Sequence, residues 1–259
     1  KIKFNSYYYD LVKNSKKKKI DTIYSDKINS IKIFRWIKKR KPDIIFCIGW
    51  SQLLNKKILN IAPKGVIGYH PSDLPKNRGR HPIIWSLALG LKNIGSSFFY
   101  MDSKADTGRI ISKKMIKIKK NSDSNSIYKN LIKEGRKQIR EIIFKMKKNK
   151  LYSFPQKNSQ SNYWRKRSEI DGKIDWRMSA DNINNLVKAL TKPYPGAYFL
   201  LKEKKIIIWK SKVINLNTRN FEPGKIIEFN KHLVIKCGSK ALKIITFHPK
   251  INLKRVKYL

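Results

Sequence analysis

Cysteine, acidic residues and long apolar runs are all scarce in this chain of 259 residues. Its two cysteines, Cys47 and Cys237, lie far apart in apolar, strand-like stretches, so the sequence supports neither a disulfide framework nor a cysteine-based metal site. No apolar run approaches the roughly 18 residues of a membrane helix, and the N-terminal segment lacks the hydrophobic core of a signal peptide. We therefore expect no metal, no membrane partner and a cytoplasmic location.

Basic residues outnumber acidic ones by 60 to 17, which gives a net charge of +43. Such an excess is typical of proteins that bind nucleic acid or anionic membrane surfaces. However, only 12 of the basic residues are arginine, and a chain rich in Lys, Ile and Asn is equally what an A/T-rich coding sequence produces. The charge therefore leaves both explanations open. Because 41% of the residues are hydrophobic, we expect a folded protein.

The first half of the chain alternates helical and strand-like patterns. Apolar residues at helical spacing between Ser30 and Arg40 precede a continuous apolar run at 44–49. Because a helix, a turn and a buried strand follow one another in this order, we predict an α/β fold with a mostly parallel sheet. The predicted helices cover 6–19, 30–40, 53–59, 83–89 and 126–148, and the predicted strands cover 44–49, 65–69, 95–101 and 110–118, with an extended segment at 20–24.

A polar composition between Phe154 and Lys173 marks the boundary between two predicted domains. We place an N-terminal domain at 1–153, a linker at 154–176 and a C-terminal domain at 177–259. Four short strands separated by turns are typical of a small β-barrel or sandwich, so we expect the C-terminal domain to be β-rich and OB-like. Its predicted elements are a helix at 180–190 and strands at 205–214, 224–229, 233–237 and 242–247.

Two polar loops each follow a predicted strand and carry groups that can move a proton. His70 opens a loop rich in Pro, Gly and Arg directly after the strand at 65–69, and Asp106 lies in the loop between the next two strands. In α/β proteins such loops hold the chemistry. An imidazole can pass a proton near neutral pH, and a carboxylate beside it fixes its tautomer. The two residues are therefore a candidate acid/base pair, although a structural hydrogen bond would give the same pattern.

Three motifs in order surround this pair: Gly65 to Pro75, Arg78 to Trp85 and Met101 to Gly108. Together they resemble the folate-dependent formyltransferases, which include methionyl-tRNA formyltransferase and the sugar-nucleotide N-formyltransferases. Two later segments, Asp171 to Trp176 and Pro193 to Ala197, look like the linker and the start of the C-terminal domain in the tRNA and sugar enzymes. The resemblance covers nearly the whole chain and implies a Rossmann-like catalytic domain.

This resemblance implies transfer of a formyl group from 10-formyltetrahydrofolate, as the formyl donor, to a primary amine, without a metal. His70, protonated, would stabilise the developing oxyanion, and Asp106 would orient it and help to remove the amine proton. Family members hold the folate through backbone groups of two loops, whose counterparts here contain Ile48, Gly49, Trp50, Ser51, Ser103 and Ala105.

The sequence departs from the family pattern at two places. The family has a catalytic asparagine two residues before the histidine, and here Gly68 stands there. Since the loss of an oxyanion-hole donor can raise a barrier by a few kcal/mol, either another group replaces this amide or the enzyme is slow. The family also begins with a strand, a helix and a strand that have no counterpart before Ser6, and the first residue is Lys1 rather than Met. Both features predict an N-terminally incomplete chain.

Arg78 and Arg80 lie in the loop whose sequence looks more like the sugar-nucleotide enzymes than the tRNA enzymes. Guanidinium groups make paired hydrogen bonds to a diphosphate, so these residues either bind a nucleotide-linked amino sugar or pin the loop. The alternative acceptor is initiator tRNA, with methionyl-tRNA formyltransferase activity, because a basic surface suits RNA. A second alternative is a non-catalytic RNA-binding module on a disabled formyltransferase fold, which Gly68 favours. A homodimer is a further expectation.

Overall fold

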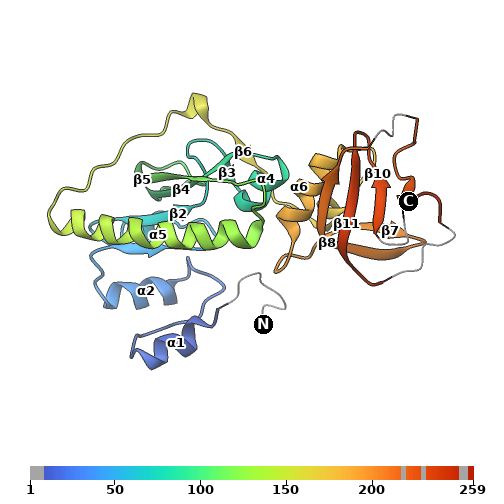
Figure 1. The fold of residues 1–259 in the computed structure, drawn as a ribbon. Coiled ribbons are helices and arrows are strands. Elements are labelled where there is room, and N and C mark those ends of the chain that lie inside the picture. The colour runs from blue at the N-terminus through green and yellow to red at the C-terminus, as the bar shows by residue number, and fades with distance from the viewer. Residues whose placement is uncertain (1–8, 217–219, 229–231, 251–255) are drawn as a thin grey trace.

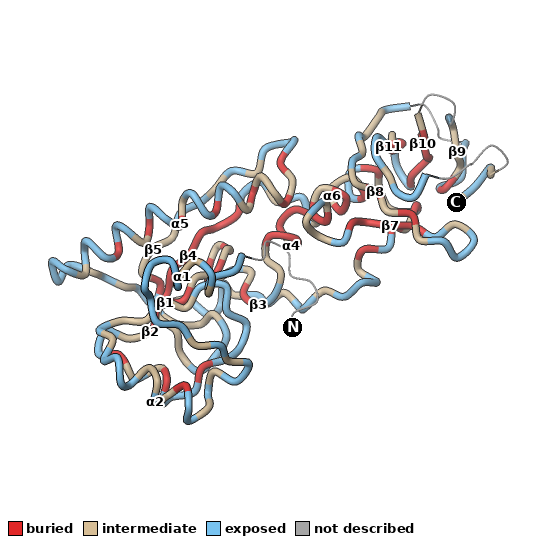
Figure 2. The backbone as a smooth tube through the Cα atoms, turned by 90° about the horizontal axis from the view of Figure 1, so that it is seen from below, coloured by how far each residue is buried: buried red, intermediate tan, exposed pale blue. Residues whose placement is uncertain are grey.

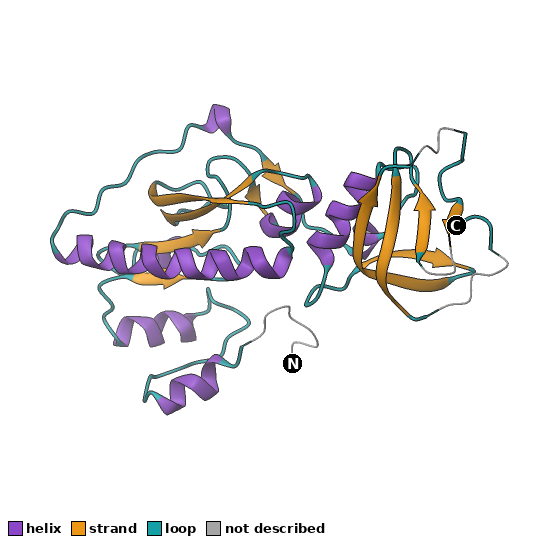
Figure 3. Ribbon diagram, viewed as in Figure 1, coloured by secondary structure: helices purple, strands orange, loops and turns teal. Residues whose placement is uncertain are grey.

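The computed structural model describes residues 9–216, 220–228, 232–250 and 256–259, arranged as two parts side by side (Figure 1). Each part contains a sheet with helices packed against it (Figure 3). The helices are α1 (Leu11–Lys17), α2 (Ile31–Lys39), α3 (Lys56–Leu59), α4 (Pro82–Ala88), α5 (Ser124–Lys147) and α6 (Ala180–Leu190), with 3-10 helices at Asn158–Gln160 and Glu169–Gly172. The strands are β1 (Ile45–Cys47), β2 (Val66–His70), β3 (Arg78–Gly79), β4 (Asn93–Tyr100), β5 (Ile110–Lys117), β6 (Tyr163–Trp164), β7 (Ala197–Leu201), β8 (Lys204–Ile214), β9 (Ile226–Glu228), β10 (Leu233–Lys236) and β11 (Ala241–His248).

The N-terminal sheet has four strands in the order β1-β2-β4-β5. Strands β1 and β2 run parallel, whereas β4 pairs antiparallel with both β2 and β5. The prediction of a mostly parallel sheet is therefore wrong, and the sheet is mixed. The loop at 101–109 is shorter than the crossover of roughly a dozen residues that would let β4 and β5 run parallel. Helix α4, which follows β2, packs against α6 of the C-terminal part instead of covering the sheet as a crossover helix.

Both faces of the N-terminal sheet are covered, because side chains alternate between the two faces of a strand. On one face, Ile45, Cys47 and Val66 pack with Phe34 and Ile37 of α2. On the other face, the intervening strand residues pack against α5, in a cluster that includes Phe46, Ile67, Tyr69, Phe98, Ile139 and Ile142. By the same alternation His70, the last residue of β2, lies on the face that α2 covers.

The C-terminal sheet has five antiparallel strands in the order β7-β8-β11-β10-β9. Four of them correspond to predicted strands, whereas the sequence patterns do not predict β7, although its residues are apolar. Across the described residues no pairing joins β9 to β7, so the sheet is a β half-barrel rather than a closed OB-like barrel. Helix α6 packs against this sheet, and its apolar residues share one core with those of the strands.

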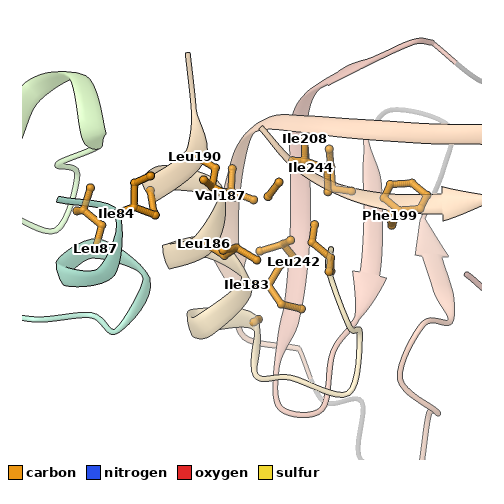
Figure 4. Close-up of a cluster of buried hydrophobic side chains, with 14 of the residues drawn as sticks. Ile84, Leu87, Ile183, Leu186, Val187, Leu190, Phe199, Ile208, Leu242 and Ile244 are labelled. Atoms are coloured by element: carbon orange, nitrogen blue, oxygen red, sulfur yellow. The ribbon is translucent and has the colours of Figure 1, made fainter. Parts of the chain in front are cut away.

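One hydrophobic core runs from the N-terminal part into the C-terminal part, through the buried faces of α4 and α6 (Figure 2). Figure 4 shows Ile84 of α4 beside Leu190 of α6. Other residues of α6, among them Ile183 and Val187, point toward the sheet and pack with Leu242. The two parts therefore bury apolar surface against each other.

Some predicted segments differ from the structure. The segment at 20–24 belongs to no sheet in the ranges described above. The predicted helix at 6–19 is shorter, because Asp10 caps α1 just before Leu11. Ser6 lies outside the described residues, as does Phe229 at the end of a predicted strand. Among the described helices, none has the length and apolar character needed to cross a membrane.

Candidate active site

The structure brings His70 and Asp106 together. His70 is only 7% exposed at the end of β2, and Asp106 lies in the loop at 101–109 between β4 and β5. This loop folds back over the face of β2 that carries Gly68 and His70, so that His70 Nδ1 and Asp106 Oδ2 are 3.7 Å apart. That distance permits an ion pair but exceeds a normal hydrogen bond, so the two atoms are not hydrogen-bonded to each other.

The contacts of the His70 ring define which nitrogen faces the pair. Nε2 lies 3.0 Å from the carbonyl oxygen of Asn77, and because a carbonyl only accepts, Nε2 carries a proton. Nδ1 then faces Asp106. A protonated ring would have an acceptor for each of its two N–H groups, and the Nδ1 proton is the one that lies near the carboxylate.

A buried polar network joins β2 to β4, β5 and helix α5, on the face of the sheet opposite His70. The hydroxyl of Ser96 donates to Gln138 Oε1 of α5 at 2.6 Å, so the 3.1 Å contact between Tyr69 and Ser96 is donated by the tyrosine hydroxyl. Gln138 also donates to the Ser96 carbonyl and to the Ser112 hydroxyl. Burial raises the pKa of Tyr69 to about 12, so this tyrosine stays protonated. The network fixes the residue that precedes His70.

Asp106 is held in position by groups from other loops. Its backbone has a φ of 58°, in the left-handed region that residues other than glycine adopt only when the surroundings impose it. The backbone N–H of Gly79 donates to Asp106 Oδ2 at 2.9 Å. Gly79 must be a glycine here, because a Cβ would lie 2.3 Å from the Trp164 carbonyl oxygen. The loops at 70–82 and 101–109 are thus tied together at the carboxylate.

Gly68 lies two residues before His70, and the space beside it is filled. A Cβ at this position would lie 2.9 Å from Met101 Cγ and 2.9 Å from Phe99 Cζ. Neither of these side chains offers a hydrogen-bond donor. At the position where the resemblance implies an amide, this chain therefore has apolar packing between β2 and the start of the loop that carries Asp106.

The two predicted folate segments lie on either side of the Gly79–Arg80 dipeptide. Gly79 contacts Asp106 of the loop that includes Ser103 and Ala105, both exposed, and Arg80 Nη2 donates to the Ser51 carbonyl at 2.9 Å. In the segment after β1, Gly49 has a φ of 67° and allows the chain to turn. Its apolar side chains, Ile48, Trp50 and Leu53, are 51%, 41% and 55% exposed.

Arg78 and Arg80 differ sharply in their surroundings. Arg78 is 2% exposed, and its guanidinium donates to Gln156 Oε1 from both Nε and Nη2, to Asn158 Oδ1 and to the Tyr163 hydroxyl. Of the two roles open from sequence, these contacts favour a loop pin for Arg78. Arg80 is exposed and keeps donors for a ligand.

The sequence patterns do not predict a cluster of aromatic and basic side chains beside Arg80, because part of this cluster lies in the segment assigned to the linker. The guanidinium of Arg167 lies 4.5 Å from the centre of the Trp85 ring, and that of Arg165 lies 5.4 Å from it. The run Trp164-Arg-Lys-Arg167 is the sequence signal that could have marked it. Asp171 pairs with Arg165, and the hydrogen bonds from that guanidinium hold the pKa of Asp171 well below its usual range.

His81 joins this cluster through its ring. Its Nδ1 accepts a hydrogen bond from the Arg167 backbone N–H at 3.2 Å, so that nitrogen carries no proton. Burial lowers the pKa of His81, and the charges of Arg167, Arg80 and Lys166 lower it further. His81 is therefore a neutral ring at neutral pH and not a second candidate acid.

A cavity of about 680 Å³ lies between the two parts of the chain, next to the loop at 70–82. It is lined on one side by the loop and the start of α4, including Pro71 and His81, and on the other by the C-terminal part, including Tyr194 and Tyr198. Arg167 and Lys205 add positive charge. A second hollow of about 590 Å³ lies between the Asp102–Arg109 loop and the segment at 155–163.

Comparisons with known proteins give consistent matches. The family model described as "Formyl transferase" matches residues 13–143, and "Formyl transferase, C-terminal domain" matches residues 166–254. The Bifunctional polymyxin resistance protein ArnA of Wigglesworthia glossinidia brevipalpis is 40% identical over 240 residues. That match covers 93% of this chain and 36% of the relative, so the chain spans about a third of that protein's length.

Solved structures share the fold at lower identity. WlaRD, a sugar 3N-formyl transferase crystallised with dTDP and 5-N-formyl-THF, has a TM-score of 0.69 at 21% identity and covers 93% of this chain and 82% of its own. The N-formyltransferase from Helicobacter canadensis, in complex with folinic acid and dTDP-3-aminofucose, has a TM-score of 0.70 at 19% identity, with coverages of 95% and 85%. Methionyl-tRNA formyltransferase from Clostridium thermocellum has a TM-score of 0.61 at 16% identity, with coverages of 90% and 91%.

Proposed function

This chain belongs to the formyl transferase family, and we propose that it transfers a formyl group from 10-formyltetrahydrofolate to the primary amine of a nucleotide-linked amino sugar. The observation that carries the proposal is the pair of buried His70 and half-buried Asp106, whose facing atoms are 3.7 Å apart. In this proposal residues 1–153 form the catalytic domain and 177–259 the C-terminal domain, joined by the linker between them.

His70 and Asp106 divide the proton chemistry. The acceptor amine forms a bond to the formyl carbon and loses a proton, and a proton is returned to the departing folate nitrogen. His70, with Nε2–H held by the Asn77 carbonyl, keeps a protonated Nδ1 that faces Asp106, and the positive charge of this ring would stabilise the negative charge that develops on the formyl oxygen. Asp106 orients that ring and accepts the proton of the amine. The Gly79 N–H keeps the carboxylate aimed at His70.

Gly68 changes how the developing charge is stabilised. The filled space beside it leaves no room for a side-chain amide, so His70 carries the stabilisation that the family shares between two residues. The ordered contacts of Asp106 with Gly79 support a site that still works, because a loop in a left-handed conformation needs such contacts to persist.

The segment after β1 fits the formyl donor. A pterin ring is flat and apolar on its faces and polar at its edge, so it suits a surface of exposed apolar side chains beside free backbone groups. Ile48 and Trp50 supply such a surface, and Gly49 lets the backbone approach closely. When bound, 10-formyltetrahydrofolate supplies the activated formyl carbon, and Ser103 and Ala105 would hold its ring edge from the opposite loop.

The cationic side of the cavity fits the acceptor. A nucleoside diphosphate carries negative charge and an aromatic base. Arg167 and Lys205 offer positive charge beside the tyrosines that line the cavity, although Lys205 pairs with Glu169, and Arg80 adds an exposed guanidinium next to His81. The two sugar formyltransferase structures named above contain a dTDP ligand, which supports the same class of acceptor for this chain.

The net charge of +43 and the likeness to the Clostridium thermocellum enzyme favour methionyl-tRNA as a second candidate acceptor. Lysines spread over the whole surface would attract RNA without placing its amine in the site, so this charge supports binding more than catalysis. The non-catalytic RNA-binding module remains the alternative in which the pair of His70 and Asp106 is inactive.

A transfer assay with the purified chain separates these functions. We would supply 10-formyltetrahydrofolate and measure formylation of UDP- and dTDP-linked 4-amino and 3-amino sugars and of charged initiator tRNA. The proposal expects formylation of an amino-sugar nucleotide and loss of that activity in His70→Ala. Formylation of tRNA alone would establish the second candidate. Salt-dependent RNA binding without transfer to any acceptor and without folate binding would establish the binding module.

A further inference from the structure

Gln156 lies in the segment after α5, distant in sequence from the loops of the candidate site, yet its side chain joins both of them. Its Nε2 donates to the backbone carbonyl of Asp106 at 2.9 Å and to that of Gly108 at 2.7 Å. Its Oε1 accepts from Arg78 at 2.8 Å from Nη2 and 3.2 Å from Nε. Every polar atom of this amide is therefore engaged by the loops that meet at the carboxylate.

The Asp106 loop needs support at its far end. Residues 102–107 are linked internally, because Asp102 Oδ1 accepts from the Lys104 N–H and the Thr107 hydroxyl. At the second half of the loop the chain passes very close to β4, since a Cβ at Gly108 would lie 1.7 Å from the Tyr100 carbonyl oxygen. Asp106, near the end of the linked segment, has a positive φ, and its backbone carbonyl accepts from Gln156.

Arg78 strengthens this support through charge. It is buried, and the hydrogen-bond acceptors around its guanidinium are neutral: the amides of Gln156 and Asn158 and the hydroxyl of Tyr163. A cation that donates to an amide oxygen polarises the amide and makes its N–H groups stronger donors. The charge of Arg78 therefore acts through Gln156 on the carbonyl of Asp106.

We propose that Gln156 is a positioning residue for formyl transfer, which acts by holding Asp106 at its working distance from His70. The inference rests on the proposed function. Gln156 is hydrogen-bonded to the backbone carbonyl of Asp106 and not to the His70 ring or the Asp106 carboxylate, so its effect must pass through the backbone of Asp106. A misplacement of about 1 Å in a reacting group can cost on the order of a hundredfold in rate, so we expect the loss of this contact to lower kcat by at least about tenfold.

Gln156→Glu is the sharpest variant. Glutamate keeps the length of the side chain and its contact with Arg78, but replaces the two N–H donors by an oxygen that faces the carbonyls of Asp106 and Gly108. Gln156→Ala removes both contacts. Two controls lie in the same segment: Gln160→Glu adds a carboxylate at an exposed position, and Asn158→Ala removes one acceptor of Arg78 without touching the Asp106 loop.

The test combines kinetics with a double-mutant cycle. Both Gln156 variants should lower kcat by about tenfold or more while KM for the donor and for the acceptor change less than twofold, and both controls should stay within twofold of the wild type. In an Asp106→Asn background the same Gln156 substitutions should have no further effect, because a residue that acts through the carboxylate loses its influence with it. Equal effects in both backgrounds would refute the positioning role.

Amide hydrogen exchange gives a readout that needs no turnover. Gln156→Ala should raise exchange in the peptide that covers 101–109 and leave α5 and the C-terminal sheet unchanged. Unchanged exchange in that peptide overturns the inference whatever the kinetics show. If the wild-type chain transfers no formyl group to any acceptor, the proposed function fails and this inference fails with it. If the wild type is active and the cycle is additive, the role of Gln156 alone is refuted.

Discussion

Replacing Gly68 with asparagine tests whether the family amide is missing or has been replaced. A Cβ at this position would lie 2.9 Å from both Met101 Cγ and Phe99 Cζ, closer than side chains normally approach. Met101 is flexible, but Phe99 is 3% exposed, so an asparagine would have to move a packed ring. Overpacking of this kind costs about 1–3 kcal/mol, which lowers the melting temperature of a chain of this size by roughly 2–10 °C.

We expect Gly68→Asn to lower turnover as well as stability, because Met101 begins the loop that carries Asp106. The measurements are kcat on one amino-sugar nucleotide at saturating donor and the melting temperature of each variant. Gly68→Ala adds only the Cβ and should lose less of both, and addition of Met101→Ala to Gly68→Asn should recover part of the melting temperature. A clear gain in turnover for Gly68→Asn, at an unchanged melting temperature, would show that the amide is simply missing and that this reasoning is wrong.

Three further predictions concern single side chains. His70→Ala and Asp106→Ala should each lower formyl transfer by at least roughly a hundredfold with little change in circular dichroism, as the removal of acid/base groups does, and unchanged turnover in either would refute its role. Arg78→Ala should destabilise the chain by about 2 kcal/mol, because it removes a side chain that is 2% exposed together with its hydrogen bonds to Gln156, Asn158 and Tyr163, whereas Arg80→Ala should raise KM for the acceptor at an unchanged melting temperature; the reverse pattern would exchange their roles. Because Arg165 holds the pKa of Asp171 low, the stability that this pair contributes is present above the ordinary carboxyl pKa and is lost as pH falls below it, so Asp171→Asn should lower the melting temperature at pH 7 and flatten its decline below about pH 4; parallel pH curves for the two proteins would contradict this.

Local patterns in the sequence predict most helices and strands and the residues of the pair, because apolar spacing and strand-ending polar residues are local signals. The direction of β4 is not local. It depends on which strand β4 pairs with and on where α4 packs. The apolar face of α4 packs against the C-terminal part, so α4 does not cover the sheet as the helix of a parallel crossover would. Strand β7 escapes because its short apolar run directly follows a segment of turn residues.

The candidate site divides in the same way. His70 and Asp106 could be named from sequence because each follows a strand, and the loop motifs locate both. Gln156 could not, since a lone polar residue in a polar segment has no pattern, and its role depends on the loops that fold onto it. For Arg78 the residue type alone could not distinguish a ligand-binding role from a structural one, because a guanidinium that can bind a diphosphate can equally hold a loop in place through hydrogen bonds.

Because α4 and α6 share one core, we expect the two parts to fold in a single cooperative transition. Helix α4 follows the loop that begins at His70, and its buried residues, Ile83, Ile84 and Leu87, belong to the same cluster as the core of the C-terminal sheet. Unfolding of that sheet would therefore remove the packing partners of α4. The end of the loop that places Gly79 against Asp106 would then lose its support. Heat or denaturant should therefore disrupt the candidate site and melt the half-barrel in one transition, so that the C-terminal part would serve as an anchor for that site.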